Sequence, residues 1–171
     1  MEKEENIQAL LDARQAGKTR FIGCSADNES ALWTVESDLF DTLQTSYNLV
    51  DQSARRDLLP QAKAQNMGVI IKRPIANAAW GAETSPSNYA HTYFMRAKEM
   101  LAEGPIPGAP DDRILLALGY VFAQDLADTM IVGTLNPRHL AANIEMVNRL
   151  LPIDAQVVEG LNGRFDHVEE N

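Results

Sequence analysis

Residues 133–137 have the types and spacing that could bind an anion. Thr134 and Asn136 are common N-cap residues, and Pro137 suits the first turn of a helix. An apolar run precedes them and an amphipathic pattern follows, so the sequence predicts a strand, a tight turn and a helix. Such a turn would present free backbone N–H groups, which favour phosphate. A plain strand-to-helix connection explains the same residues, because most helix N-termini hold no ligand.

Composition narrows the class of protein and of partner. The chain has 171 residues, 45% of them hydrophobic, which predicts one globular domain over residues 1–171. A net charge of −9 argues against nucleic acid or an anionic membrane surface as a partner. No signal-peptide pattern opens the chain, and no apolar run approaches the ~18 residues of a membrane span. We therefore expect a cytoplasmic protein.

Cysteine and histidine usage predicts neither a disulfide nor a metal site. Cys24 is the single cysteine, which excludes an internal disulfide. The three histidines, His91, His139 and His167, do not have metal-ligand spacing with one another or with Cys24.

Apolar periodicity and breaker residues place the secondary structure. Helices are expected over residues 4–16, 28–37, 53–65, 88–102 and 113–123, from 137 onward, and from 152 to about 163. Strands are expected over residues 20–25, 40–47, 69–71 and 130–132. Asp27 or Asn28 would cap the second helix, and Asp111 the fifth. This alternation predicts parallel strands joined by right-handed crossovers, in a flavodoxin-like sheet or in half of an eight-fold barrel.

The stretch from residue 129 to 147 resembles the last strand–helix unit of the aldo-keto reductases. In that family this turn and helix hold the adenosine phosphate end of NADP(H). The matching cofactor positions are Gly133, Thr134, Asn136, His139 and Asn143. Gly133 stands where many members carry lysine, His139 where many carry arginine, and Ala142 where many carry glutamate. The resemblance therefore implies a weaker 2′-phosphate clamp and leaves NADP versus NAD open.

Three further segments resemble the same family, in the family's order. Residues 17–25 are similar to its fifth strand, where Ser25 matches the serine that hydrogen-bonds the nicotinamide carboxamide. Residues 40–49 are similar to the sixth strand, with Gln44 at the position that contacts the same carboxamide. Residues 68–76 are similar to the seventh, and there Lys72 replaces the aromatic residue that commonly stacks on the nicotinamide ring. Arg73 and Pro74 complete this third group of candidate cofactor contacts.

The resemblance implies an α/β fold that is half of an eight-stranded TIM barrel, with about four parallel strands and outer helices. The family's catalytic tyrosine, lysine, aspartate and histidine come from the first four strands, which have no counterpart in these motifs. No catalytic residue is therefore predicted here. Substrate loops vary freely in this fold, so the substrate is not readable.

Two functions are consistent with these motifs. In the first, the chain is an oxidoreductase subunit that carries the NADP(H)-binding half of the barrel and reduces a carbonyl only when the other half is supplied. In the alternative, it is a non-catalytic half-barrel, nucleotide-binding or structural, that self-associates. The expected partners are a nicotinamide nucleotide and either a second copy or a complementary half-barrel chain.

A half-barrel would leave the inner face of its sheet bare. That face would carry Phe21 or Ile22, Ile70 or Ile71, and the apolar residues 131 or 132. Parallel sheets are normally covered on both faces, and two long strand edges would also be open. We therefore expect an oligomer, either a two-fold dimer that closes an eight-stranded barrel or a looser face-to-face pair.

Overall fold

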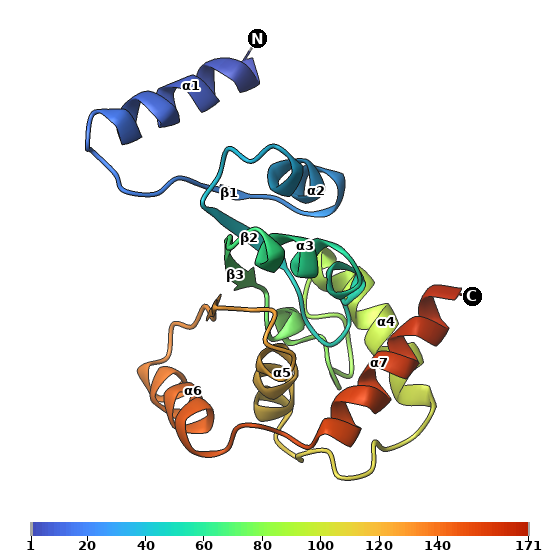
Figure 1. Ribbon diagram of the computed structural model, residues 1–171. Helices are drawn as coiled ribbons and strands as arrows, with labels where there is room; N and C mark the ends of the chain where they lie inside the picture. The colour runs from blue at the N-terminus through green and yellow to red at the C-terminus, as the bar shows by residue number, and fades with distance from the viewer. Residues whose placement is uncertain (1, 171) are drawn as a thin grey trace.

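The computed structural model describes residues 2–170, in which helices and strands alternate (Figure 1). The strands are β1 (Gly23–Ser25), β2 (Thr42–Ser46), β3 (Gly68–Lys72) and β4 (Thr129–Ile131). The α-helices are α1 (Glu2–Gln15), α2 (Asn28–Glu36), α3 (Leu58–Ala64), α4 (His91–Ala102), α5 (Arg113–Phe122), α6 (Pro137–Arg149) and α7 (Ala155–Glu170). Short 3-10 helices, η1 (Ser53–Arg55), η2 (Ala76–Ala78) and η3 (Asn88–Ala90), lie in the connections.

The strands form one parallel sheet in the order β1-β2-β3-β4. The α/β architecture with about four parallel strands is therefore confirmed. A flavodoxin-like sheet would place its second strand at the edge, in the order 2-1-3-4-5, and the observed order excludes it. Strands that neighbour each other in chain order are the arrangement of a (β/α) barrel wall.

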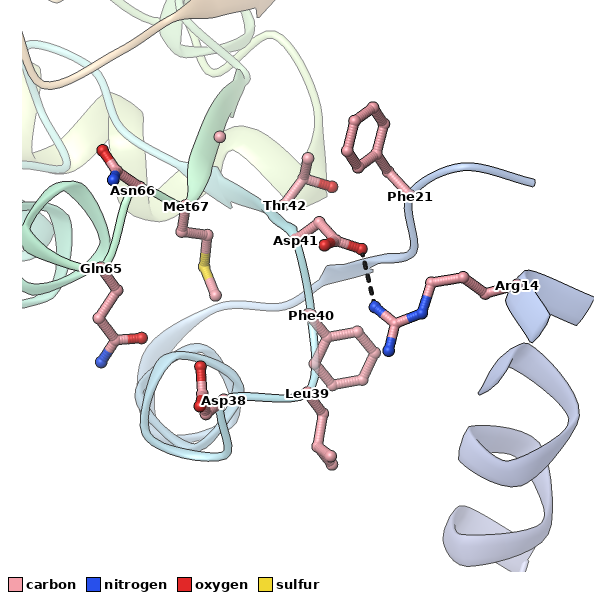
Figure 2. Close-up of a pocket in the computed structure, with 11 residues that line it drawn as sticks. Arg14, Phe21, Asp38, Leu39, Phe40, Asp41, Thr42, Gln65, Asn66 and Met67 are labelled. Carbon is pink, nitrogen blue, oxygen red and sulfur yellow. Dashed lines mark hydrogen bonds and ion pairs between the residues drawn. The ribbon is translucent and has the colours of Figure 1, made fainter. Parts of the chain in front are cut away.

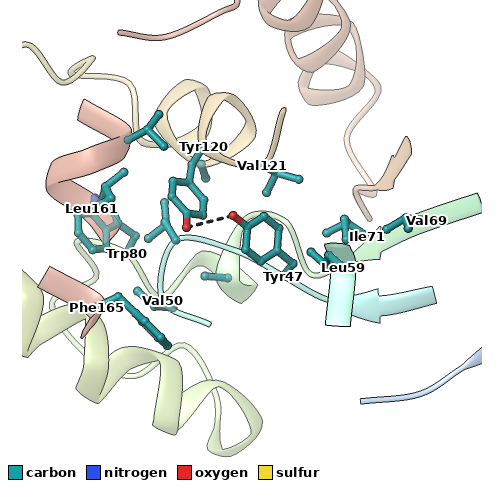
Figure 3. Packing of buried hydrophobic residues seen from close by; sticks show 14 of the residues in the cluster. Tyr47, Val50, Leu59, Val69, Ile71, Trp80, Tyr120, Val121, Leu161 and Phe165 are labelled. Carbon is teal, nitrogen blue, oxygen red and sulfur yellow. Dashed lines mark hydrogen bonds between the residues drawn. The ribbon is translucent and has the colours of Figure 1, made fainter. Parts of the chain in front are cut away.

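The sheet has one covered face and one open face. In β2 and β3 the side chains of Leu43, Val69 and Ile71 are fully buried, whereas those of Gln44 and Ile70, which point the other way, are only half-buried. The covered face packs against the helices in a single hydrophobic core (Figure 3). We call the opposite side, which carries Gln44 and Ile70, the open face.

The outer strands β1 and β4 have three residues each, so the edges of the sheet are shorter than expected. β1 has three residues instead of the six expected, because the backbone N–H of Ile22 donates to the Asp41 carboxylate, at 2.8 Å, instead of joining the ladder. Ile22 is buried and Phe21 is exposed. Of the apolar residues expected on the open face, the strands themselves place Ile70 and Ile131 there, among polar and small residues.

A tyrosine pair lies inside the core. Tyr47 donates a hydrogen bond to the hydroxyl of Tyr120 at 3.1 Å (Figure 3), and Tyr120 donates to Asn162 Oδ1 at 2.8 Å. Both rings are fully buried. The chain of donors lets two hydroxyls enter the core without an unpaired group, and it ties α5 to α7 and to the end of β2.

One expected cap and two expected helix boundaries are wrong, each for a local reason. The fifth predicted helix is capped by Asp112 and not by Asp111, since Asp112 Oδ1 accepts the N–H groups of Ile114 and Leu115 at 2.8 and 3.0 Å. The expected helix over 53–65 is split into η1 and α3, which places Pro60 in the first turn of α3, where a missing N–H costs no hydrogen bond.

The last helix was expected over residues 152 to about 163, but it begins at Ala155 and continues to Glu170. Asp154 Oδ1 accepts the N–H of Gln156, which sets the start. Beyond Gly163 the helix continues because Phe165 is buried and Asp166 pairs with Arg55 and Arg56.

The open face is closely packed at Thr42, which lies between two glycines of the neighbouring strands. The register aligns Gly23 with Thr42 and Thr42 with Gly68. A Cβ added at Gly23 would lie 2.1 Å from Thr42 Oγ1 and 3.1 Å from its carbonyl oxygen, so Thr42 fits only because Gly23 has no side chain.

We predict that Gly23→Ala lowers the free energy of unfolding by about 1–3 kcal/mol, the usual cost of overpacking. Urea denaturation followed by circular dichroism measures the change. Thr42→Ala in the same chain removes the Oγ1 contact and should recover part of the loss.

Gly163→Ala is the matched control, because a Cβ there meets no atom within 4 Å and the residue lies inside α7. It should leave stability unchanged or raise it by about 0.5–1 kcal/mol. Equal effects of the two glycine substitutions would contradict the packing argument.

Candidate functional site

Ser25 and Lys72, the last residues of β1 and β3, lie together with Gln44, two residues before the end of β2. Gln44 Nε2 donates to Ser25 Oγ at 2.8 Å, and Lys72 Nζ donates to the same oxygen at 3.4 Å. Ser25 and Gln44 are aligned neighbours in the β1–β2 ladder. The sheet thus brings three of the predicted residues into one hydrogen-bonded group on the open face.

Asp27 holds this group in place. It occupies the N-cap position of α2, but its carboxylate makes no cap hydrogen bond, contrary to the role expected for it. Instead Oδ1 accepts the backbone N–H of Ser46 at 2.8 Å, and Oδ2 lies 3.0 Å from Lys72 Nζ and 3.4 Å from Arg73 Nη1. The one carboxylate therefore links the ends of β1, β2 and β3. We call Ser25, Asp27, Gln44, Lys72 and Arg73 the rim cluster.

The pKa of Asp27 lies below its ordinary value of 3.8. Burial opposes ionisation of the carboxyl, but the hydrogen bonds from the Ser46 backbone and from Lys72 outweigh it. Asp27 is therefore ionised at neutral pH. One carboxylate against two cations leaves the rim cluster with a net charge of +1 in a chain of net charge −9.

Arg73 has a backbone conformation that residues other than glycine rarely adopt. Its φ is 58°, in the left-handed region, which costs roughly 1–2 kcal/mol for a residue other than glycine. Nη1 donates to Ser46 Oγ at 2.7 Å, and the guanidinium lies 4.9 Å from the centre of the Tyr89 ring. These contacts fix Arg73 beside Lys72. Pro74, the next predicted contact, is buried.

A second acid lies beside the rim cluster. Burial raises the pKa of Asp51, and Tyr93 donates a hydrogen bond to its Oδ2 at 2.6 Å. Burial and the Asp51 charge raise the pKa of Tyr93 to about 12. Burial raises the pKa of Tyr47 to about 12 as well, and that of Tyr120 further. These three tyrosines keep their protons at neutral pH and are poor general acids.

The turn before α6 forms as predicted, and the N–H groups at its helical end are bonded within the chain. Asn136 is the N-cap residue, and its Oδ1 accepts the N–H of Arg138 at 3.0 Å. The carbonyl oxygen of Asn136 accepts the N–H of His139 at 3.0 Å, and Thr134 Oγ1 accepts the N–H of Asn136 at 3.1 Å. Pro137 has no N–H. The expectation of free backbone donors is therefore wrong for Asn136, Arg138 and His139.

The other residues of this predicted group are spread along α6. Gly133, Thr134 and His139 are exposed, whereas Asn143 lines a groove between α6 and β4. A Cβ at Gly133 would meet no atom within 4 Å, so a longer side chain fits there. Lys72 and Ile131, the last residues of β3 and β4, are aligned in the sheet. The turn after β4 therefore lies at the same end of the strands as the rim cluster.

Asp27, Ser46 and Tyr89 were not predicted as site residues. Asp27 lies two residues after Ser25, and its position predicted a helix cap, which left no reason to assign it to the site. Its contacts run to Ser46 and Arg73, 19 and 46 residues away. Only the parallel register brings them together.

A second hollow lies at the opposite ends of the strands. It has a volume of about 420 Å³ and is lined by residues that include Phe21, Phe40, Asp41 and Met67 (Figure 2). Arg14 pairs with Asp41 at 3.3 Å on its wall. It contains none of the rim cluster.

Within residues 2–170, no group of three or more His, Cys, Asp or Glu side chains could hold a metal ion. Over the same residues, none of the helices has the length and apolar character needed to cross a membrane.

We predict that Asp27→Asn lowers the free energy of unfolding by about 1–2 kcal/mol at pH 7, through loss of the charge that pairs with Lys72 and Arg73. Because the folded-state pKa is lowered, this stabilisation is fully present above the unfolded value near 3.8 and is lost as pH falls through the folded value.

Urea denaturation between pH 7 and pH 3 should therefore show the wild-type and Asp27→Asn chains converging at the acidic end. Asp111→Asn, at an exposed aspartate in a loop, is the control and should have little effect at any pH. A difference that stays constant with pH would contradict the role of the Asp27 charge.

The comparisons with known proteins agree with this architecture. The sequence model of the aldo/keto reductase family matches residues 2–162. The holo form of the aldo-keto reductase AKR11C1 from Bacillus halodurans superimposes with a TM-score of 0.74 at 19% identity, over 94% of this chain and 55% of that one. Its apo form gives a TM-score of 0.75 at 19% identity, over 94% and 56%. The chain thus spans a little over half the length of these reductases, and by the match of its sequence it belongs to the aldo/keto reductase family.

Proposed function

We infer that this chain is the nicotinamide-nucleotide-binding half of an aldo-keto reductase barrel. The observation that carries this proposal is the hydrogen-bonded Ser25–Gln44 pair, which lies beside Lys72 at the carboxyl ends of the strands. In barrels of this kind ligands bind at the carboxyl ends of the strands. A bound nicotinamide nucleotide would supply the hydride for reduction of a carbonyl.

The rim cluster suits the nicotinamide end of such a nucleotide. A carboxamide has one carbonyl acceptor and one NH₂ donor. Ser25 Oγ and the Gln44 amide, 2.8 Å apart, offer both a donor and an acceptor to it. Lys72 cannot stack on a ring as an aromatic side chain does, and its ammonium group is fixed by Asp27 at 3.0 Å. Lys72 would therefore hold the carboxamide oxygen or a nearby phosphate rather than the ring face.

The turn before α6 suits the adenosine end, although its backbone donors are occupied. Thr134, Asn136 and His139 are exposed there, and Asn143 follows one turn after His139. A phosphate would displace the Asn136 side chain from the Arg138 N–H, which exchanges one hydrogen bond for another. We therefore propose weak binding, with discrimination between NADP and NAD left to Gly133, His139 and neighbouring side chains.

Proton donation would have to come from outside the rim cluster. Tyr93 is the nearest of the three tyrosines with raised pKa values, and its hydroxyl is committed to Asp51. We propose that carbonyl reduction requires the strands of the other half-barrel, which bring the proton donor. If the chain binds no nucleotide, the alternative of a structural, self-associating half-barrel replaces this proposal.

We predict that NADPH binds this chain and that Ser25→Ala and Gln44→Leu each weaken binding about 5- to 10-fold, the loss of roughly one hydrogen bond. Titration of nucleotide fluorescence gives the dissociation constants. Nicotinamide mononucleotide, followed by saturation-transfer NMR, should report the same losses, because it carries only the end that meets Ser25 and Gln44.

Gln65→Leu is the matched control. It makes the same change as Gln44→Leu at an exposed residue beside the hollow at the opposite ends of the strands, and should leave NADPH binding unchanged. Equal binding by the wild-type, Ser25→Ala and Gln44→Leu chains would exclude the rim cluster as the nicotinamide site.

A second prediction concerns the adenosine end. Asn136→Asp places a carboxylate at the proposed phosphate position, where like charges repel, and should weaken 2′,5′-ADP binding at least about tenfold. Aspartate is as good an N-cap as asparagine, so α6 keeps its stability. Isothermal titration calorimetry measures the change.

Two further variants make this test specific. Asn6→Asp, on the exposed surface of α1, adds the same charge far from the turn and should leave 2′,5′-ADP binding unaltered. Gly133→Lys adds a cation where the structure has room and should strengthen binding. If Asn136→Asp binds as the wild type does, the turn is not the phosphate site.

A further inference from the structure

Tyr93 lies one helical turn after Tyr89, on the same side of the segment formed by η3 and α4. Tyr89 places its ring 4.9 Å from the Arg73 guanidinium. Two tyrosines of one helical segment therefore face the residue that follows Lys72 at the end of β3. Tyr93 was not predicted as a site residue either.

The hydroxyl of Tyr93 lies between a buried carboxylate and the rim cluster. It donates to Asp51 Oδ2 at 2.6 Å. Burial and the Asp51 charge raise the pKa of Tyr93 to about 12. Hydrogen bonds from the Ser46 and Arg73 side chains oppose this rise, so both side chains reach the Tyr93 oxygen. Arg73 Nη1 also donates to Ser46 Oγ at 2.7 Å, which joins the two donors to each other.

Asp51 is itself held in place from two sides. Arg96 Nη1 lies 3.7 Å from Asp51 Oδ1 and donates to the carbonyl oxygen of Val50 at 3.3 Å. The backbone N–H of Asp51 donates to the Asn48 carbonyl at 3.0 Å, and the N–H of Asn48 donates back to the Asp51 carbonyl at 3.1 Å. The acceptor of the Tyr93 hydroxyl is therefore fixed by the loop after β2 and by α4.

Arg73 is the member of the rim cluster that most needs such support. An arginine side chain has many rotamers and loses much conformational freedom when it is fixed. The Arg73 side chain is still 28% exposed, so a ligand beside Lys72 can reach its guanidinium. Contacts that order the guanidinium in the free chain lower the entropy that a ligand must remove on binding.

We propose that Tyr93, held by Asp51, is a positioning residue that orients the Arg73 guanidinium for an anionic group of the nucleotide. The ligand in this statement rests on the proposed function, whereas the orientation of Arg73 does not. Tyr93 itself does not transfer a proton, because its hydroxyl already donates to Asp51. Removing that hydroxyl would free Arg73 without deleting a group that touches the ligand.

The experiment removes the hydroxyl alone, as Tyr93→Phe, and measures NADPH binding by titration of nucleotide fluorescence. Binding should become about 3- to 10-fold weaker, because the ligand must then order Arg73. Tyr120→Phe is the matched control. It removes the hydroxyl of a buried tyrosine that bonds Asn162 in the core, and should leave binding unchanged. Circular dichroism checks that both variants are folded.

A double-mutant cycle separates positioning from a general loss of structure. Arg73→Met removes the guanidinium, and adding Tyr93→Phe to that chain should change NADPH binding less than about twofold, because no guanidinium remains to be oriented. Asp51→Asn keeps an oxygen acceptor for Tyr93 and should bind NADPH within about threefold of the wild type. Asp51→Ala has no acceptor and should bind as weakly as Tyr93→Phe.

An NMR measurement tests the orientation of Arg73 without a ligand. In a chain with isotope-labelled arginine, the Nε–Hε resonance that Arg73→Met removes should shift in Tyr93→Phe and stay in place in Tyr120→Phe. An unchanged resonance in Tyr93→Phe, equal binding by Asp51→Asn and Asp51→Ala, or additive losses in the double variant would overturn the proposal. A shifted resonance in a chain that binds no NADPH would contradict the proposed function and still support the positioning of Arg73.

Discussion

Side-chain alternation along β2 and β3 is the constraint on which the other features of this chain depend. Leu43, Val69 and Ile71 enter the core, and this places Gln44 and Lys72 on the opposite face. A register slip of one residue would bury Lys72 and expose Ile71, at a cost that no contact in the rim cluster could offset. Core packing therefore fixes the orientation of the candidate site before any ligand is present.

Asp27 is the second feature that holds the candidate site in place. Its carboxylate bonds the Ser46 N–H and two cations, so the ends of β1, β2 and β3 are held by charge as well as by the ladder. Because the Asp27 carboxylate lies within reach of both cations, it offsets their mutual repulsion, and Lys72 and Arg73 can lie side by side at Ser25 and Ser46. The left-handed backbone of Arg73 is tolerated because its side chain is anchored by Ser46 and stacked on Tyr89.

The sequence predicted the four parallel strands between helices and the turn at Asn136, because each depends on local periodicity or on a short motif. Periodicity left the strand order open between two folds, and only the resemblance to the family favoured the observed one. The sequence could not predict the role of Asp27, whose partners lie 18 to 46 residues away. It also placed Asp111 where Asp112 caps α5, since neighbouring aspartates are equivalent as residue types. The end of the last helix was missed because burial of Phe165 outweighs the helix-breaking tendency of Gly163.

Both ends of the candidate nucleotide site are already satisfied by the chain itself. Gln44 bonds Ser25, and Asn136 bonds the N–H of Arg138, so a ligand would replace existing hydrogen bonds rather than pair orphaned groups. Exchange of this kind contributes little net free energy, whereas pairing an unsatisfied buried group would contribute much more. The pre-formed geometry limits the conformational entropy lost on binding, and so orientation rather than affinity is what these residues can provide. Strong binding would require surface that covers the open face and excludes water, and the free edges of β1 and β4 are where that surface can attach.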